Sequence, residues 1–231
     1  MRAHSALSDA VALATVRAAS WLLAAPSPHV SALRPRLPLI LYEFEACPFC
    51  RRVREALEVL CIEAEVRPCP KGGERFRPAA IARGGRAQFP FLVDPNTGSE
   101  LYESSDIVSY LYGRYAASGA NHTLRAAWLG SLASALRLGR GSRVRASRAP
   151  ALPLLLSGAE SNPEARLVRE MLSELELFHI SRRGDPNGSP VLEDPNANAR
   201  PVGWPRIRAH LEYTYALGVA KKEPPRPAGS A

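Results

Sequence analysis

The spacing of hydrophobic residues along the first half of the chain changes several times, and each change predicts a new element. The run LPLILYEF at 37–44 is short and apolar, which predicts a buried strand. In VREALEVL at 53–60 the apolar residues recur at helical spacing, and Pro48 is well placed to begin that helix. IEAEVRP at 62–68 alternates apolar and polar residues and predicts a second strand.

The pattern continues with two more strands and a second helix. FPFLV at 89–93 and ELYE at 100–103 predict strands, and DPNTG at 94–98 has the residues of a turn between them. Ser104 or Ser105 is expected to cap the next helix, whose apolar face recurs up to Tyr115. The order is strand, helix, strand, loop or short helix, strand, hairpin, strand, helix, which predicts an α/β fold.

The same order of residues recurs later in the chain. A shift of 115 aligns the segment around Pro48 with the segment around Pro163. A shift of 100 aligns PFLVDPN at 90–96 with PVLEDPN at 190–196, because the first copy has a longer loop around 72–87. A repeat of this length, seen twice, predicts a duplicated domain rather than a solenoid.

These patterns divide the chain into five parts. We expect an N-terminal segment at 1–36, a first domain at 37–118, a helix with a basic linker at 119–150, a second domain at 151–220 and a disordered tail at 221–231.

The N-terminal segment has two interpretations, and both stay open. It is rich in Ala, Ser and Arg with Asp9 as its one acidic residue, a composition typical of an organelle transit peptide. Alternatively, TVRAASWLL at 15–23 resembles TLRAAWLGSL at 123–132, so residues 11–24 are a helix of the mature protein.

Charge, hydrophobicity and cysteine positions indicate which partners and which cellular compartment to expect. The net charge is +8, but the arginines are scattered and lack interleaved aromatics, so we expect no nucleic-acid partner. No run reaches the roughly eighteen apolar residues of a membrane span. All four cysteines lie in the first third of the chain, which favours a reducing compartment over a secreted disulfide framework.

The motif CPFC at 47–50 is the strongest candidate for chemistry. Cys47 precedes the predicted helix, where backbone N–H groups, the helix dipole and the arginines at 51, 52 and 54 favour the thiolate. Cys50 lies one turn further on and is expected to be the shielded, resolving thiol. The residues predict a nucleophile at Cys47 that forms a mixed disulfide, which Cys50 then releases.

The four cysteines also have a metal-binding and a structural interpretation. A zinc site needs further ligands at suitable spacing, which Cys61 and Cys69 do not provide, so we expect no metal. An inert structural pair is disfavoured next to a proline at a helix start. Cys61 is expected in the core at the end of a helix face. Cys69 lies at a predicted strand end, where its exposure stays open, and nothing marks it as reactive.

The combination of a strand, CPFC and a helix, then FP before a hairpin, then YES, resembles a thioredoxin fold. It is similar to glutaredoxins and to the N-terminal domains of glutathione S-transferases. The arrangement with a second copy resembles the tandem glutathione-transferase-N-terminal-like proteins of plant and algal plastids. The resemblance implies two tandem thioredoxin-like domains, a chloroplast location or otherwise a cytoplasmic one, and glutathione as cofactor. It also keeps open an iron–sulfur cluster bridged by Cys47 and glutathione.

The resemblance also implies a glutathione site. Phe89 and Pro90 would be joined by a cis bond, and the backbone of Phe89 would pair with the cysteinyl part of glutathione. Glu103 and Ser104 would hold the γ-glutamyl end, where a helix N-terminus favours a carboxylate. The glycyl carboxylate needs a cation, and three residues of the long loop are candidates for it: Lys71, Arg83 and Arg86.

The second copy departs from this chemistry and is expected to be degenerate. Asn162 and Ala165 replace the two cysteines, and Gly203-Trp204 replaces the Glu-Ser pair.

The resemblance and the residues together predict a glutathione-linked thiol–disulfide oxidoreductase that acts on disulfide-bearing or glutathionylated proteins. Two alternatives stay open, a non-catalytic redox sensor or scaffold and a glutathione transferase. A glutathione transferase needs a large helical domain after its N-terminal domain. Residues 119–150 predict one helix, which is too little for that domain, so thiol–disulfide exchange is favoured over conjugation.

Overall fold

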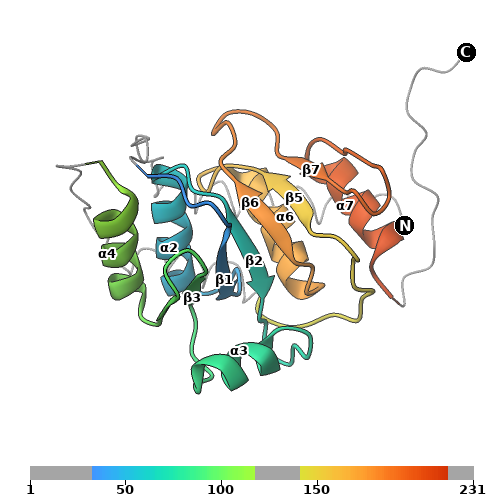
Figure 1. The fold of residues 1–231 in the computed structure, drawn as a ribbon. Helices are drawn as coiled ribbons and strands as arrows, with labels where there is room; N and C mark the ends of the chain where they lie inside the picture. The colour runs from blue at the N-terminus through green and yellow to red at the C-terminus, as the bar shows by residue number, and fades with distance from the viewer. Residues whose placement is uncertain (1–32, 118–140, 218–231) are drawn as a thin grey trace, which may run out of the picture.

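The computed structural model describes residues 33–117 and 141–217 (Figure 1). Three expectations concern residues outside these ranges. They are the two interpretations of the N-terminal segment, the helix predicted before the basic linker of the 119–150 segment, and the tail. Within the described ranges, no helix is long and apolar enough to cross a membrane.

Residues 33–117, called here the first half, contain four strands and three helices. These are β1 (Leu39–Glu43), α2 (Pro48–Val59), β2 (Ala64–Pro68), α3 (Arg77–Gly84), β3 (Phe91–Asp94), β4 (Ser99–Leu101) and α4 (Ser104–Tyr115). β1 runs parallel to β2 and antiparallel to β3, and β4 pairs antiparallel with β3. Every strand and long helix predicted in this region is present. The segment predicted as a loop or short helix contains α3.

Alternate residues of β1 serve two cores because the strand is covered on both faces. Leu39 and Leu41 pack with the apolar faces of α2 and α4. Tyr42, on the opposite face, packs with Phe91 and with Ala80 of α3. The first half is therefore a sheet between two layers of helix, and this arrangement brings the first turn of α2 next to the start of α4.

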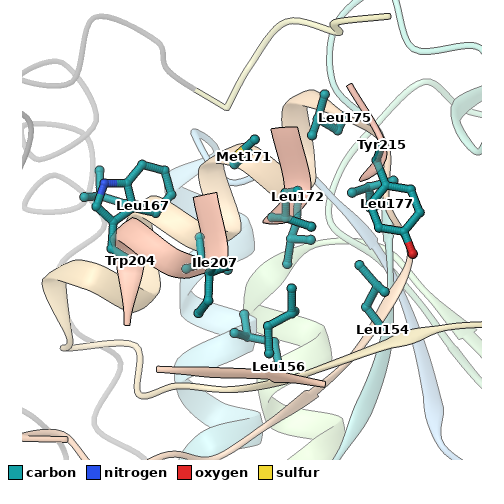
Figure 2. Close-up of a cluster of buried hydrophobic side chains, with 13 residues drawn as sticks. Leu154, Leu156, Leu167, Met171, Leu172, Leu175, Leu177, Trp204, Ile207 and Tyr215 are labelled. Atoms are coloured by element: carbon teal, nitrogen blue, oxygen red, sulfur yellow. The ribbon is translucent and has the colours of Figure 1, made fainter. Parts of the chain in front are cut away.

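Residues 141–217, called here the second half, repeat most of this order. They contain β5 (Leu154–Ser157), α6 (Pro163–Glu174), β6 (His179–Arg182), β7 (Val191–Glu193) and α7 (Trp204–Thr214). β5 runs parallel to β6 and antiparallel to β7. Its core is a cluster in which leucines of β5 and α6 surround Ile207 of α7, with Trp204 and Tyr215 at its ends (Figure 2). The connection at 183–190 is described and contains no helix, so this half has no equivalent of α3.

The two halves share one seven-stranded sheet with the order β4-β3-β1-β2-β6-β5-β7. They meet where β2 pairs antiparallel with β6, in the pairs Ala64↔Ser181, Glu65↔Ile180 and Val66↔His179 (Figure 1). The central pair joins Glu65 to Ile180, two residues that the sequence shift of 115 aligns. Each half therefore presents the equivalent strand position to the other, so the halves face each other about a local two-fold axis. The chain is thus a mixed α/β sheet. Its division into two tandem thioredoxin-like domains stays a prediction.

Equivalent contacts occur in both halves. The Tyr115 hydroxyl donates to the carboxylate of Asp94, and the Tyr215 hydroxyl donates to Asp194 at 2.8 Å. Each aspartate begins the DPN turn, and each tyrosine lies at the end of the following helix. The two DPN segments found in the sequence therefore have the same structural task, which is to tie the turn to the last helix.

Buried charges from both halves gather at the junction. Nε of Arg54 on α2 lies 3.0 Å from Glu160 of the second half, and Nε of Arg169 on α6 lies 3.3 Å from Glu45 of the first half. Arg54 also donates to Glu43, the last residue of β1. We call these five residues, Glu43, Glu45, Arg54, Glu160 and Arg169, the junction cluster.

The carboxylates of the junction cluster differ in acidity. Burial raises the pKa of Glu43 to about 7, although Arg54 opposes the shift. Burial also acts against ionisation of Glu160, but the guanidinium groups of Arg169 and Arg54 lower its pKa to about 2. Glu160 is therefore the lasting anion of the cluster, whereas Glu43 changes charge near neutral pH.

We expect His179, at the junction on β6, to destabilise the fold in acid. Burial lowers the pKa of His179 from 6.5 to about 4, so its stabilising effect is present above pH 6.5 and is lost as the pH falls through 4. The loss amounts to at most about 3 kcal/mol in the free energy of unfolding. Urea unfolding of wild type and His179→Met at a series of pH values measures it.

Wild type and His179→Met must be compared at each pH, because the titration of Glu43 changes the free energy of unfolding in the opposite direction. Its raised pKa stabilises the fold below 4.5, and that contribution is lost as the pH rises through about 7. Subtracting the variant from the wild type removes the Glu43 contribution. A difference that does not change between neutral pH and pH 4 would contradict the assignment to His179.

Candidate functional site

Cys47 occupies the residue that caps the N-terminus of α2. Its backbone is extended, with φ −79° and ψ 116°, and Pro48 begins the helix. The Cys47 sulfur accepts a hydrogen bond from the backbone N–H of Cys50 at 3.3 Å. The CPFC sequence produces this geometry because proline suits the first helical position and lacks the N–H that would need a partner there. The sulfur thus faces the free N–H groups of the helix.

The two cysteines have opposite acidity. A hydrogen bond from the Cys50 side chain is the main cause that lowers the pKa of Cys47, and the backbone N–H groups of Cys50 and Phe49 add to it. Burial raises the pKa of Cys50 well above its ordinary value. Cys50 is 0% exposed and Cys47 is 5% exposed, so Cys47 is the sulfur that an external disulfide can reach.

The arginines of the motif do not have the role that the sequence suggested. Arg51 and Arg54 are buried and turn towards the second half, where Arg51 lies 3.4 Å from the carbonyl oxygen of Glu160. Arg52 instead lies 3.4 Å from the hydroxyl of Ser104 at the start of α4. The expectation that all three arginines activate Cys47 is therefore wrong, and hydrogen bonds within the motif lower its pKa instead.

The remaining predicted residues lie around the start of α2. The Cys47 sulfur is 3.9 Å from the carbonyl oxygen of Phe89, and the Phe89–Pro90 bond is cis. Glu103 has a positive φ of 61° and accepts a hydrogen bond from Gln88. Ser104 begins α4 and is buried. The structure thus brings Cys47 next to Phe89, and the first turn of α2 next to Ser104.

The other two cysteines differ in burial, and the expectation for Cys61 is wrong. Cys69 is fully buried, because it packs in the core on the α3 side of the sheet. Cys61 is partly exposed rather than in the core, and it has a positive φ of 53° just after α2 ends. Across residues 33–117 and 141–217, no three His, Cys, Asp or Glu side chains gather in a way that could hold a metal ion.

A cation that the sequence did not single out contacts the site. The guanidinium of Arg77 lies 4.9 Å above the ring of Phe89 and donates to the carbonyl oxygen of Cys69 at 3.0 Å. Of the three cations named from the sequence, Arg83 pairs with Glu100 at 2.8 Å, Arg86 lies over the ring of Tyr102, and the backbone of Lys71 pairs with Ser142. Sequence spacing could not show that the start of α3 faces Phe89.

The second half fills the equivalent positions with other groups. Asn162 caps α6 as Cys47 caps α2, and its side-chain oxygen accepts the N–H of Ala165 at 3.0 Å. The carboxylate of Glu164 accepts the backbone N–H of Trp204 at 3.1 Å, at the start of α7. A carboxylate of the chain itself thus binds the helix N-terminus that corresponds to Ser104 in the first half. The cap geometry is kept, whereas the sulfur is not.

Comparison with known proteins gives one family match and similar solved structures, each over part of the chain. Residues 41–119 match the family described as Glutathione S-transferase, N-terminal domain. No curated protein sequence matches the chain. A solved structure of the Bombyx mori glutathione transferase BmGSTD1 is 24% identical over 40% of this chain and 43% of that chain, with a TM-score of 0.35. A second structure of that protein, in complex with GTT, has the same identity and coverage and a TM-score of 0.36. The chain therefore corresponds to less than half the length of these transferases.

Two substitutions at Cys50 test what lowers the pKa of Cys47. The hydrogen bond from the Cys50 side chain is the largest contribution. Serine keeps an O–H donor at this position and alanine has none. We expect the pKa of Cys47 to stay low in Cys50→Ser and to rise in Cys50→Ala. The rate of alkylation of Cys47 as a function of pH measures both, and equal midpoints in the two variants would refute the role of this side chain.

Proposed function

We propose that the protein is a glutathione-linked thiol–disulfide oxidoreductase with Cys47 as its nucleophile. The observation that carries this proposal is the pair of opposite pKa shifts within one turn of α2, lowered at Cys47 and raised at Cys50. A thiolate is the reactive form of cysteine, and a resolving cysteine must stay protonated until it is needed. The two directions match a nucleophile at Cys47 and a resolving thiol at Cys50.

The proposed reaction reduces a glutathionylated protein in two steps. The Cys47 thiolate attacks the glutathione sulfur, a bond forms between these two sulfurs, and the protein thiolate leaves and takes a proton from water. A glutathione thiolate then attacks the bound glutathione, which restores the Cys47 thiolate and releases glutathione disulfide. Alternatively, Cys50 attacks the Cys47 sulfur and releases glutathione, and two further glutathione molecules reduce the resulting disulfide.

Glutathione is the proposed ligand for three reasons. Residues 41–119 match a glutathione S-transferase N-terminal domain. The backbone of Phe89 lies beside Cys47, where it could pair with the cysteinyl part of glutathione. The start of α4 at Ser104 offers N–H groups to a carboxylate, and the exposed carboxylate of Glu103 could meet an ammonium group.

Glutathione transfer to an electrophile is the second candidate, and the family match favours it. Its chemistry uses the same glutathione site but needs a hydrophobic site for the electrophile. In the described part of the chain, β6 of the second half pairs with β2. That half has a filled core of its own, so the apolar side chains of this core are buried and do not form a site for an electrophile.

We expect Cys47→Ser to reduce the turnover of a glutathionylated peptide to the uncatalysed rate, because the hydroxyl is a far weaker nucleophile than the thiolate. Cys50→Ser should keep activity, because free glutathione can resolve the mixed disulfide. A coupled assay of glutathione disulfide formation measures both variants. Wild type that conjugates an electrophile but does not turn over the peptide would support a transferase instead. A single reaction without turnover would support a redox sensor.

A second prediction concerns Arg77 as the cation for the glycyl carboxylate. Arg77→Leu should raise the KM for glutathione about tenfold or more, since a hydrogen bond to a charged group contributes about 1.5–3 kcal/mol. Arg83→Leu is the matched comparison, because Arg83 is exposed on the same helix and pairs with Glu100. Steady-state kinetics on both variants decide the question. An equal KM in the two variants would exclude Arg77 from the site.

A further inference from the structure

Helix α3, which places Arg77 beside Phe89, has little support from its own half. Ala80 is the one residue of this helix that is buried. Near the C-terminal end of the helix, Arg83 pairs with Glu100 at 2.8 Å, but both side chains are exposed. An exposed ion pair contributes little to stability. The position of the start of α3 therefore depends on contacts made outside the helix.

The carboxylate of Glu176, in the second half, binds the chain just before α3. One of its oxygens accepts the backbone N–H of Arg75 at 3.1 Å, and the other accepts the backbone N–H of Glu74 at 3.3 Å. Glu176 is buried and follows α6 with a positive φ of 48°. Gly73 permits the close approach, because a Cβ at that position would lie 2.5 Å from the carboxylate. Two charge-assisted hydrogen bonds thus fix the backbone as it enters α3.

The side chain of Arg75 makes a second connection to the same place. Its guanidinium donates to the carbonyl oxygen of Glu176 at 2.8 Å and to the carbonyl oxygen of Ser147 at 2.9 Å. The ring of Phe76, the next residue, packs against the ring of Phe178 with 6.0 Å between the ring centroids. Three successive residues before α3 therefore contact the second half. We call Glu176 and Arg75 together the clamp.

The position related to Glu176 by the local two-fold axis contains a different residue. Cys61 lies there, and it too has a positive φ, of 53°. Arg183 of the second half lies 4.0 Å from the Cys61 sulfur and 3.4 Å from the carbonyl oxygen of Glu58. A thiol is a weak acceptor and does not replace a carboxylate. The second half has no equivalent of α3, and its carboxylate instead holds the α3 of the first half.

We propose that the clamp holds the start of α3 so that the guanidinium of Arg77 stays beside Phe89, where it binds the glycyl carboxylate of glutathione. The proposal rests on the proposed function. Arg77 is the first residue of α3 and lies 4.9 Å above the ring of Phe89, whose carbonyl oxygen is 3.9 Å from the Cys47 sulfur. Pairing of a guanidinium with a carboxylate depends on geometry, so a small displacement of α3 weakens it. Glu176 is thus a positioning residue, because it contacts the chain before α3 and not the reacting sulfur.

Calorimetric titration of the full chain with reduced glutathione measures the Kd without any turnover. Glu176→Gln keeps the size of the side chain but replaces one acceptor oxygen with an amide nitrogen, which cannot accept a backbone N–H. We expect the Kd to rise about three- to tenfold. The rise should not exceed the rise in Arg77→Leu, because Glu176 acts through Arg77. Arg75→Leu breaks the clamp from the other side and should raise the Kd in the same range.

A double variant decides whether the clamp acts through Arg77. Glu176→Gln should raise the Kd when it is made in wild type and should leave the Kd unchanged when it is added to Arg77→Leu. An equal rise in both backgrounds overturns the proposal. The midpoint of Cys47 alkylation with pH should stay at its wild-type value in Glu176→Gln, because hydrogen bonds within the CPFC motif set it. A shifted midpoint would locate the effect at the cysteine and also overturn the proposal.

Glu164→Gln is the matched control. The Glu164 carboxylate also accepts a backbone N–H at a helix start, that of Trp204 at 3.1 Å, but both residues belong to the second half. Its Kd should equal that of wild type, and thermal unfolding of every variant records any loss of stability separately. A wild-type Kd in Glu176→Gln, an equal rise in Glu164→Gln or absence of glutathione binding in wild type overturns the proposal. Wild type that binds glutathione but does not turn over a glutathionylated peptide would instead refute the proposed function, so the two failures are distinguishable.

Discussion

The arrangement of the two halves depends on the buried charges of the junction cluster. Three residue pairs between β2 and β6 are a short ladder, and a ladder alone allows other registers. A slip would separate Arg54 from Glu160 and Arg169 from Glu45 and would leave charges buried without partners. Breaking a buried ion pair from one side costs about 3–5 kcal/mol. The cluster therefore selects one register, even though a buried ion pair adds little net stability.

The same cluster connects this structural task with the cysteines. Arg54 and Cys50 lie on one helix, and Arg54 binds Glu43 on the side that faces the second half. The second half contains no cysteine. Its Glu160 and Arg169 nevertheless act electrostatically on Glu43, which Arg54 joins to the helix of the CPFC motif. This contribution gives the second half a physical role, although its helix caps are Asn162 and Gly203.

The sequence predicted the elements of the first half well because each has a strong local signal. A short apolar run defined β1 and alternation defined β2. Helical spacing defined α2 and α4, and proline marked where α2 begins. The pairing of the DPN turns with Tyr115 and Tyr215 also follows the repeat. Local patterns of this kind depend on residues that are neighbours along the chain.

Predictions about side-chain environment were weaker because they depend on contacts far apart in sequence. Arg51 and Arg54 follow the motif and suggested an electropositive cysteine site, but both are buried and contact Glu160 of the second half. Cys69 is buried because α3 covers it, and Arg77 faces Phe89 for the same reason. No periodicity within the chain signals which helix will cover which strand end.

The junction of β2 with β6 also decides what the sheet presents to other proteins. A strand at the side of a sheet has unpaired backbone groups that can recruit a strand from another chain. Pairing β2 with β6 leaves β4 and β7 as the outermost strands of the described sheet, and both span three residues. The isolated bridges Val191↔Val202 and Asp194↔Ala199 further occupy the outer side of β7. By uniting its halves the chain protects itself against aggregation through its edges.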